Sequence, residues 1–141
     1  MKRNASAQWT GDLSSGTGIL STASGVLSST PYSFKSRFEQ GTGTNPEELL
    51  AAAHAGCFTM ALSLFLGQAG FKPGSLNTTC TISLEKDGEG FSITQSHLEL
   101  KAKVPGLSKQ AFDDAVEQAK TNCPVSKLYD TEIILNATLE Q

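Results

Sequence analysis

Two segments in the second half of this chain alternate largely between apolar and polar residues. The alternation predicts strands at Leu76–Glu85 and Phe91–Val104, and the intervening Lys86–Gly90 is typical of a hairpin connector. The apolar parity of the second strand is expected to face a core, while the opposite parity, which includes His97, is expected to face solvent. Apolar residues at every second position also predict a last strand over Ile133–Leu139.

Shorter apolar segments occupy the first part of the chain, between clusters of Gly, Ser and Thr. Because turn-forming residues bound each of them, we expect short strands there. These strands are predicted at Ala5–Trp9, Thr17–Thr22, Val26–Ser28 and Ser33–Glu39. The glycine-rich segment Gly41–Pro46 that follows is expected to form a flexible loop.

One long, almost wholly apolar run begins in "TNPEELLAAAHAGCF" and predicts a central helix. Asn45 is the expected N-cap, Pro46 occupies the first helical position, and Glu48 follows the cap by three residues, as in a capping box. The helix should continue to about Gln68, where glycines end it. It touches the lower length limit for a membrane span, but His54 and the other polar residues within it favour a buried helix.

A second helix is predicted to begin after Ser108, with apolar residues at helical spacing along one face. Its expected buried stripe is Ala111, Phe112, Ala115, Val116 and Ala119. Pro124 interrupts this helix and is a suitable first residue for a short third one.

The order of these elements predicts an α+β fold with a mainly antiparallel sheet, built as a single domain over residues 1–141. A central helix that is apolar on most of its circumference needs more cover than one small sheet can give. We therefore expect an intimate homodimer.

Composition narrows the possible partners and the cellular compartment. The net charge of −3 disfavours nucleic acid and anionic membranes as partners, because both require clustered Lys and Arg. The first residues contain no apolar signal sequence, and the three cysteines do not resemble a secreted disulfide framework. We expect a cytoplasmic protein with reduced thiols in its resting state.

Cys123 and Cys57 are the candidate reactive thiols. Pro124 favours a helix start immediately after Cys123, where backbone N–H groups stabilise a thiolate, although Cys123 could equally be a residue that only ends a helix. Cys57 lies inside the apolar helix, where a thiol usually packs as a small hydrophobe and burial raises its pKa. A catalytic role would require a fixed positive charge, and Arg37 is one of only two arginines in the chain.

The remaining candidates have weaker signals. Cys80 lies on the inward parity of its strand and is expected to pack in the core. His54 and Cys57 share a helix face and could form a metal site with Cys123, but neither a C-x-x-C pair nor an H-x-x-x-H pair accompanies them. We therefore expect no metal site. The sequence also contains no glycine-rich phosphate loop and no G-x-S-x-G motif.

The combination of "TNPEELLAAAHAGCF" with "NCPVSKLY" far downstream resembles the OsmC/Ohr family of thiol-dependent peroxidases over essentially the whole chain. The resemblance implies a homodimeric α+β fold that reduces organic hydroperoxides with a pair of cysteines. The OsmC branch fits better than the Ohr branch, since Arg37 lies in "SRFEQGTGTNPEEL" and not in the glycine-rich stretch near the N-terminus. His54 also stands where Ohr proteins usually carry an aromatic residue.

The resemblance assigns a role to each candidate residue. Cys57 would be the peroxidatic cysteine, Cys123 the resolving cysteine that forms a disulfide with it, Arg37 the activating cation and Glu47 the carboxylate that holds Arg37. No cofactor is implied, and an external dithiol, either a small molecule or a lipoyl-type protein, would supply electrons during oxidative or osmotic stress. The apolar wall of the central helix leads us to expect a preference for alkyl hydroperoxides over hydrogen peroxide.

Helical spacing places a constraint on this assignment. Glu47 and Cys57 are ten positions apart, so one continuous helix separates them by about 15 Å. Either Glu47 precedes the true helix and folds back, or Arg37 and Glu47 reach Cys57 across a dimer interface. The second arrangement is favoured, because the apolar helix already requires a partner.

A function from a different class also fits the two cysteines. The chain could be a non-enzymatic thiol redox sensor, or a stress protein that binds a small hydrophobic ligand. The presence of Arg37 with Glu47 disfavours this alternative, because a sensor has less need of such a pair.

Overall fold

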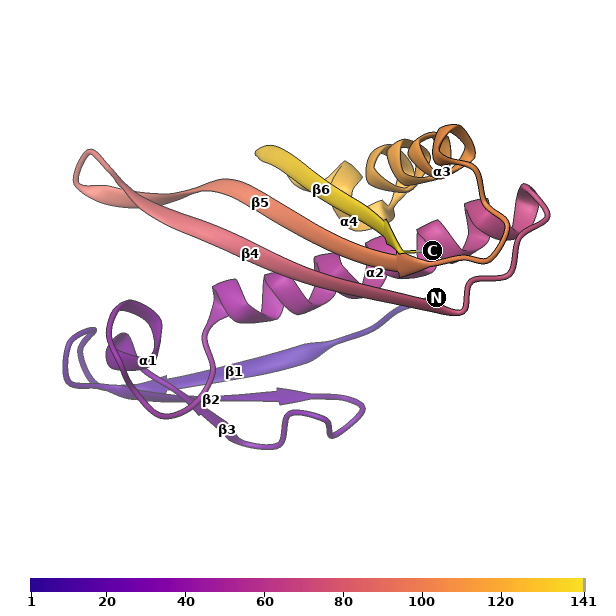
Figure 1. Ribbon diagram of the computed structural model, residues 1–141. Helices are drawn as coiled ribbons and strands as arrows, with labels where there is room; N and C mark the ends of the chain where they lie inside the picture. Colours follow the sequence, from indigo (N-terminus) through magenta and orange to yellow (C-terminus); the bar gives the residue numbers. More distant parts are fainter. Residues whose placement is uncertain (141) are drawn as a thin grey trace. The chain divides into compact units, whose positions relative to one another are not determined.

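The structure, a computed structural model, describes residues 1–140 and contains in that range two three-stranded sheets and four helices (Figure 1). The predicted α+β class is therefore confirmed. The chain divides into two units, Met1–Leu49 and a second unit that begins at Leu50.

The first unit is an antiparallel sheet followed by one short helix. Strands β1 (Ala5–Thr10), β2 (Thr17–Thr22) and β3 (Thr30–Tyr32) lie in the order β1-β2-β3. Helix α1 (Phe34–Phe38) follows immediately. The first two strands agree with the sequence pattern to within one residue.

Two strands predicted in the first unit are wrong. Residues Val26–Ser28 form a bend, where the Thr22 backbone N–H donates to the Leu27 carbonyl and the Leu27 N–H donates to the Thr22 hydroxyl, and the strand begins only at Thr30. The other predicted strand, Ser33–Glu39, is helix α1. A reciprocal capping box, in which Ser33 and Ser36 each bond the other's backbone N–H, starts this helix and outweighs the turn signals on which the strand prediction rested.

Helix α2 (Pro46–Gln68) has the predicted bounds. The Asn45 side chain accepts a hydrogen bond from the backbone N–H of Glu48 at 2.8 Å, as expected of an N-cap. The predicted capping box is incomplete, since the Glu48 carboxylate accepts instead from the Thr44 hydroxyl at 3.0 Å. Asn45 also donates to the carbonyl of Ser36 at 3.0 Å, which ties α1 to the start of α2.

The second unit contains a sheet with one parallel edge. Strands β4 (Ser75–Asp87) and β5 (Gly90–Lys103) form the predicted antiparallel hairpin. Strand β6 (Glu132–Glu140) pairs with β5 in parallel, so the chain must cross over between them, and helices α3 (Lys109–Asn122) and α4 (Pro124–Leu128) make that crossover (Figure 1).

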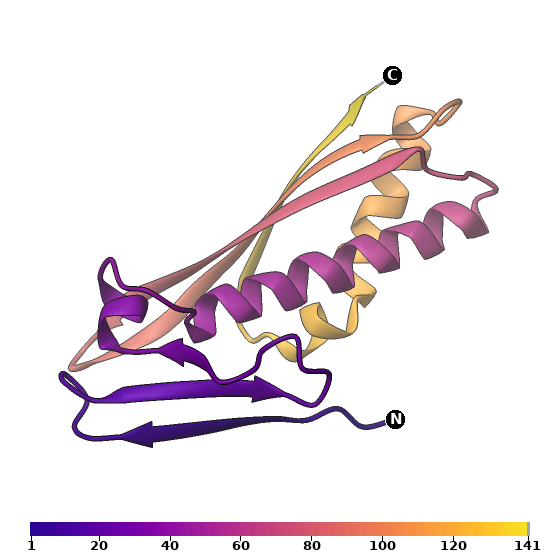
Figure 2. The ribbon, with the colours of Figure 1, turned by 90° about the horizontal axis from the view of Figure 1, so that it is seen from below.

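The core of the second unit lies between one face of this sheet and the helices α2 and α3. Figure 2 shows α2 running along the sheet. Helix α2 presents residues at a spacing of four, and all of them lack exposed surface: His54, Phe58, Leu62 and Leu66. The inward parity of β5 and the predicted stripe of α3 complete the cluster: Leu98, Leu100, Ala102, Val104, Phe112, Ala115, Val116 and Ala119. Each buried Leu or Phe stabilises the fold by about 1.5–3 kcal/mol.

The opposite face of α2 carries exposed apolar side chains. Met60 is 77% exposed and Leu64 is 57% exposed. By length and composition alone α2 would also suit a membrane span, yet its buried stripe belongs to the core described above. An uncovered apolar strip along a central helix is typical of a surface that meets another protein.

Candidate active site

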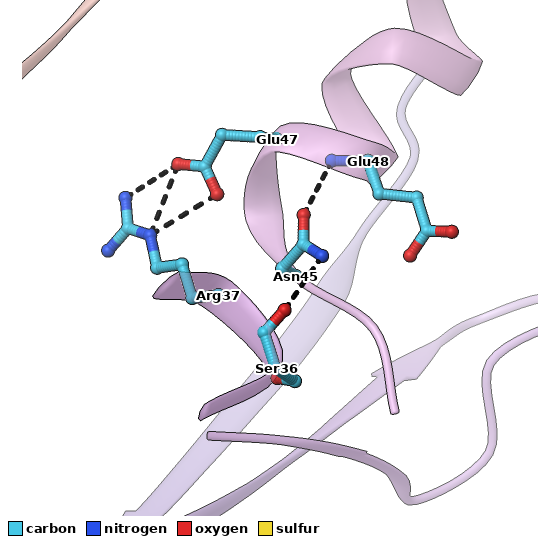
Figure 3. Close-up of polar contacts among 5 residues, drawn as sticks. All are labelled: Ser36, Arg37, Asn45, Glu47 and Glu48. Carbon is cyan, nitrogen blue, oxygen red and sulfur yellow. Dashed lines mark hydrogen bonds and ion pairs between the residues drawn. The ribbon is translucent and has the colours of Figure 1, made fainter. Parts of the chain in front are cut away.

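Helix α1 and the start of α2 position the first pair of candidate residues. The loop between them returns to β3, where the Thr44 backbone N–H bonds the Pro31 carbonyl at 2.9 Å. Gly43 has a φ of +106°, and a Cβ there would lie 2.1 Å from that same carbonyl oxygen, so only glycine fits. The tight return brings Arg37 of α1 opposite Glu47 of α2 (Figure 3).

Arg37 and Glu47 form a multiply bonded ion pair. Arg37 Nε lies 3.1 Å and 3.2 Å from the two Glu47 carboxylate oxygens, and Nη2 lies 2.8 Å from Oε1. The Glu47 side chain is 11% exposed and that of Arg37 is 39% exposed. The Arg37 guanidinium also lies over the Phe38 ring, 5.2 Å from its centroid. Such a pair fixes a planar cation in place through Nε and Nη2, and Nη1 takes no part in it.

An apolar cavity of about 280 Å³ lies beside Arg37 in the first unit. Four aromatic side chains line it: Trp9, Tyr32, Phe34 and Phe38. Trp9 and Tyr32 pack with ring centroids 5.4 Å apart, and Phe34 and Phe38 with centroids 4.9 Å apart. The first unit therefore places the ion-paired guanidinium of Arg37 beside a cavity lined by aromatic side chains.

The second unit brings the two predicted reactive cysteines together. Cys57 is a half-buried residue of α2, and Cys123 is the fully buried N-cap of α4. Both are free thiols, and the Cys123 side chain lies close enough to Cys57 to raise the pKa of the Cys57 thiol. The backbone N–H of Val125, in the first turn of α4, donates to the Cys57 sulfur. The start of α4, which the sequence predicts to stabilise a thiolate at Cys123, thus also provides an N–H group to the Cys57 sulfur.

These surroundings act on the Cys57 thiol in opposite directions. Burial raises the pKa of Cys57 above its ordinary value, and the neighbouring Cys123 side chain raises it further. The Val125 N–H lowers the pKa, because it bonds the thiolate more strongly than the thiol. The net shift is upward, so a reactive thiolate at neutral pH requires an additional positive charge.

A buried network around His54 was missed in the sequence analysis. His54 Nδ1 lies 2.6 Å from the Ser96 hydroxyl of β5, and Nε2 lies 2.8 Å from the Ser126 hydroxyl of α4. The Tyr129 ring packs edge-on against the imidazole with centroids 5.0 Å apart, and its hydroxyl donates to the Leu50 carbonyl at 2.9 Å. A serine on the apolar parity of β5 is the sequence signal that could have revealed this network.

Cys80 lies at the edge of the same network, on the inward face of β4 as predicted. Its sulfur is 3.3 Å from the Ser96 hydroxyl. Burial raises the pKa of Cys80, with Ser96 acting weakly in the opposite direction. Burial also raises the pKa of the Tyr129 phenol, followed by smaller effects of Cys80, Cys123 and Cys57, so this tyrosine lies near all three thiols.

Among residues 1–140, no group of three His, Cys, Asp or Glu side chains has the geometry of a metal site. The two ring nitrogens of His54, the most plausible metal ligand in the sequence, both bond serine hydroxyls. The arrangement of the two cysteines is suited instead to thiol chemistry.

Burial lowers the pKa of His54 below its ordinary value of 6.5, which predicts a pH dependence of stability. The folded state holds His54 neutral, so its contribution is complete above that value and is lost as the pH falls toward the depressed pKa. The slope approaches about 1.4 kcal/mol per pH unit for one proton. Urea unfolding at about pH 7.5 and about pH 5 should show a smaller acid loss in His54→Gln than in the wild type. The surface variant His97→Gln should behave as wild type, and equal slopes in all three proteins would contradict the assignment.

Comparison with known proteins places the chain in one family. The sequence model described as OsmC-like protein matches residues 39–137, which include Glu47, Cys57 and Cys123. Peroxiredoxin OsmC of Escherichia coli (strain K12) is 49% identical over 140 residues, covering 99% of this chain and 98% of that protein. An organic hydroperoxide resistance protein of Xanthomonas axonopodis pv. citri (strain 306) is 34% identical over 100 residues, covering 70% of this chain and 68% of that protein.

Solved structures agree on the fold. An OsmC-like protein of unknown function from Vibrio cholerae matches with a TM-score of 0.77 at 18% identity, over 98% of this chain and 99% of that one. At this identity the likeness concerns the fold alone. Together with the sequence matches over nearly the full length, it leads to one conclusion: this chain belongs to the OsmC-like protein family.

Proposed function

We propose that this chain is a peroxidase that reduces organic hydroperoxides to alcohols in stress defence, with Cys57 and Cys123 as its redox-active pair. The observation that carries the proposal is the proximity of these two thiols, one on a central helix and the other at a helix start, with Cys123 near enough to act on the pKa of Cys57. The relatives named as a peroxiredoxin and as an organic hydroperoxide resistance protein support the same activity.

In the first step the Cys57 thiolate attacks the terminal oxygen of the hydroperoxide. An S–O bond forms, the O–O bond breaks, and the alkoxide takes a proton and leaves as the alcohol, so that Cys57 becomes a sulfenic acid. The Val125 N–H, which already bonds the sulfur, helps to stabilise the thiolate. Burial opposes the thiolate, so we assign the missing positive charge to Arg37.

Arg37 would stabilise both the thiolate and the charge that develops as the O–O bond breaks. Glu47 holds its guanidinium through Nε and Nη2, which leaves Nη1 for the reacting groups. Because Glu47 and Cys57 are about 15 Å apart along α2, we propose that Arg37 of one protomer serves Cys57 of its partner. The exposed apolar strip of α2 around Met60 and Leu64 is the surface that such a homodimer would cover.

In the second step Cys123 attacks the Cys57 sulfenic acid. The S–S bond forms, the S–O bond breaks, and water leaves with the thiol proton. A dithiol, either a small molecule or a lipoyl-type protein, then reduces the disulfide by exchange and is itself oxidised to a disulfide. These steps use only side chains, a hydroperoxide and a dithiol, so the scheme includes no prosthetic group.

The substrate class follows from the surroundings of the cation. The aromatic cavity beside Arg37 would receive the apolar part of an organic hydroperoxide, which hydrogen peroxide lacks. We therefore propose that organic hydroperoxides react faster than hydrogen peroxide. The complete enzyme would be a cytoplasmic homodimer in which each chain, residues 1–141, acts as one OsmC-like domain.

Mass spectrometry after one equivalent of cumene hydroperoxide tests the proposal. The expected product is a Cys57–Cys123-linked peptide pair, together with continuous turnover when a small or lipoyl-type dithiol is supplied. The value of kcat/KM should be higher for cumene hydroperoxide than for hydrogen peroxide, and equal values would contradict the substrate preference. Oxidation of the thiols without turnover under either dithiol would contradict the peroxidase function and indicate a redox sensor.

A further inference from the structure

His54 occupies a fully buried position on α2, and the two steps above give it no part. The other members of its buried stripe are phenylalanine and leucine, so an apolar residue would be the ordinary choice there. A polar ring in such a place destabilises the fold unless its nitrogens are bonded. Both are bonded, to Ser96 and to Ser126, and these serines come from two different elements.

The hydrogen bond between His54 and Ser126 lies beside the contact between the two thiols. His54 precedes Cys57 by three residues on α2, and Ser126 follows Cys123 by three residues at α4. Side chains three apart on a helix share a face. The two contacts therefore join the same pair of elements at neighbouring points, so the 2.8 Å bond fixes how closely the thiols approach.

Helix α4 depends on such bonds for its position. It has five residues, and helices this short are not stable by themselves. Apart from packing, side-chain hydrogen bonds at two points tie it to α2. Ser126 bonds His54 within the helix, and Tyr129, its C-cap, bonds the Leu50 carbonyl at 2.9 Å.

The chemistry of the ring requires both serines. A neutral imidazole has one N–H donor and one acceptor nitrogen, so one serine must accept and the other must donate. Burial keeps His54 neutral, which suits this arrangement. Ser96 is in turn contacted by the Cys80 sulfur at 3.3 Å, which restricts the rotation of its hydroxyl. The ring is thus anchored to β5 on one side and holds α4 on the other.

We propose that His54 is a positioning residue, which through Ser126 holds α4 where Cys123 can reach the oxidised Cys57. The inference rests on the proposed function and concerns only its second step. In that step the Cys123 sulfur must approach to an S–S bond of about 2.05 Å with a restricted dihedral angle. The first step takes place at Cys57 and draws on α4 only through the Val125 N–H, whereas in the second step Cys123 itself has to reach the Cys57 sulfur.

The two steps should therefore respond differently when the His54–Ser126 bond is removed. Formation of the sulfenic acid should slow much less than closure of the disulfide, because it uses only the Val125 N–H of α4. Closure of the disulfide should slow by about tenfold to a hundredfold, because a small misplacement of reacting groups reduces a rate by about this factor. Because the sulfenic acid then persists, excess hydroperoxide should convert more Cys57 to the sulfinic acid.

A rapid-quench single turnover of the full-length protein separates the two steps. Protein is mixed with one equivalent of cumene hydroperoxide, and mass spectrometry follows the Cys57 sulfenic acid and the disulfide over time. The variants are His54→Leu, which removes both bonds, Ser126→Ala, which removes one, and His54→Gln, whose amide can both donate and accept. We expect slow closure in the first two and substantial recovery in His54→Gln.

Matched controls and a second variant keep the result decisive. His97→Leu changes the other histidine of the chain, which bonds Asn136 at the surface, and should close at the wild-type rate. If His54→Leu does not fold, Ser126→Ala carries the test, since it deletes a single hydroxyl. Closure at the wild-type rate in Ser126→Ala, or equal slowing of both steps, would overturn the inference while the proposed function stands. A wild-type protein that forms neither sulfenic acid nor disulfide would instead remove the proposed function itself.

Discussion

Replacing Cys57 with serine is expected to abolish turnover of organic hydroperoxides, while replacing Cys123 with serine leaves the first oxidation intact. A serine hydroxyl is not ionised at neutral pH and cannot form a sulfenic acid, so no reduced alcohol should accumulate above the uncatalysed rate. In Cys123→Ser one alcohol per protomer should form in a burst, after which the Cys57 sulfenic acid has no partner thiol. Quantifying the alcohol without added dithiol, with and without a sulfenic acid trap, measures the burst, and quantifying it with dithiol measures the loss of turnover in Cys57→Ser.

Cys80→Ser is the matched control for these two substitutions. Cys80, on β4, contacts Ser96 of β5 and takes no part in the proposed chemistry, so its replacement should leave the burst and the turnover within about twofold of the wild type. Turnover that survives in Cys57→Ser, or that disappears in Cys80→Ser, would show that a thiol other than Cys57 reacts with the hydroperoxide, and would refute the scheme.

Arg37→Met is expected to lower kcat/KM for cumene hydroperoxide by about 10²–10³-fold, the usual loss when one charge-stabilising donor is removed. Without the guanidinium, burial remains the largest influence on Cys57, so its thiol pKa should rise relative to the wild type. Alkylation of Cys57 as a function of pH measures that shift. Arg3→Met is the control, because Arg3 is the other arginine of the chain and its exposed guanidinium donates to the neighbouring Lys2 carbonyl.

Mixed dimers of Arg37→Met and Cys57→Ser chains test where the arginine acts. If Arg37 of one protomer serves its partner, each mixed dimer contains one complete site, and random exchange should restore about a quarter of the wild-type activity. If Arg37 serves its own chain, both sites of the mixed dimer are defective. Mixtures that stay as inactive as the separate variants would therefore exclude a site in which Arg37 of one protomer acts on Cys57 of its partner.

The sequence was most informative where a local chemical signal and a periodic pattern agreed. Asn45 and Pro46 define the start of α2, Ser108 caps α3, and the alternation in β5 identifies its buried face, all of which the structure confirms. The start of α4 at Pro124 is confirmed for the same reason. Helix caps and strict periodicity depend on neighbours in the chain, so they can be recognised without knowledge of the fold.

The errors and omissions depend on contacts between distant residues. Helix α1 was predicted as a strand because turn-forming residues bound a short segment with apolar residues, while the capping box between Ser33 and Ser36 decides in favour of a helix. The partners of His54 could not be found from spacing, since Ser96 and Ser126 are 42 and 72 residues away in sequence. The parallel pairing of β6 with β5 likewise follows from the crossover and not from the strand pattern itself.

The places of Cys57 and Cys123 in the chain have a consequence for resistance to denaturation. The whole β4–β5 hairpin and helix α3 lie between them in sequence, so a disulfide would enclose most of the second unit in one covalent loop. Closing a loop of this length restricts the unfolded chain and stabilises the fold by about 4 kcal/mol in the chain-entropy model. Each catalytic cycle would therefore alternate between a more stable oxidised enzyme and a less stable reduced one, and the pool of reductant would set how resistant the population is to unfolding.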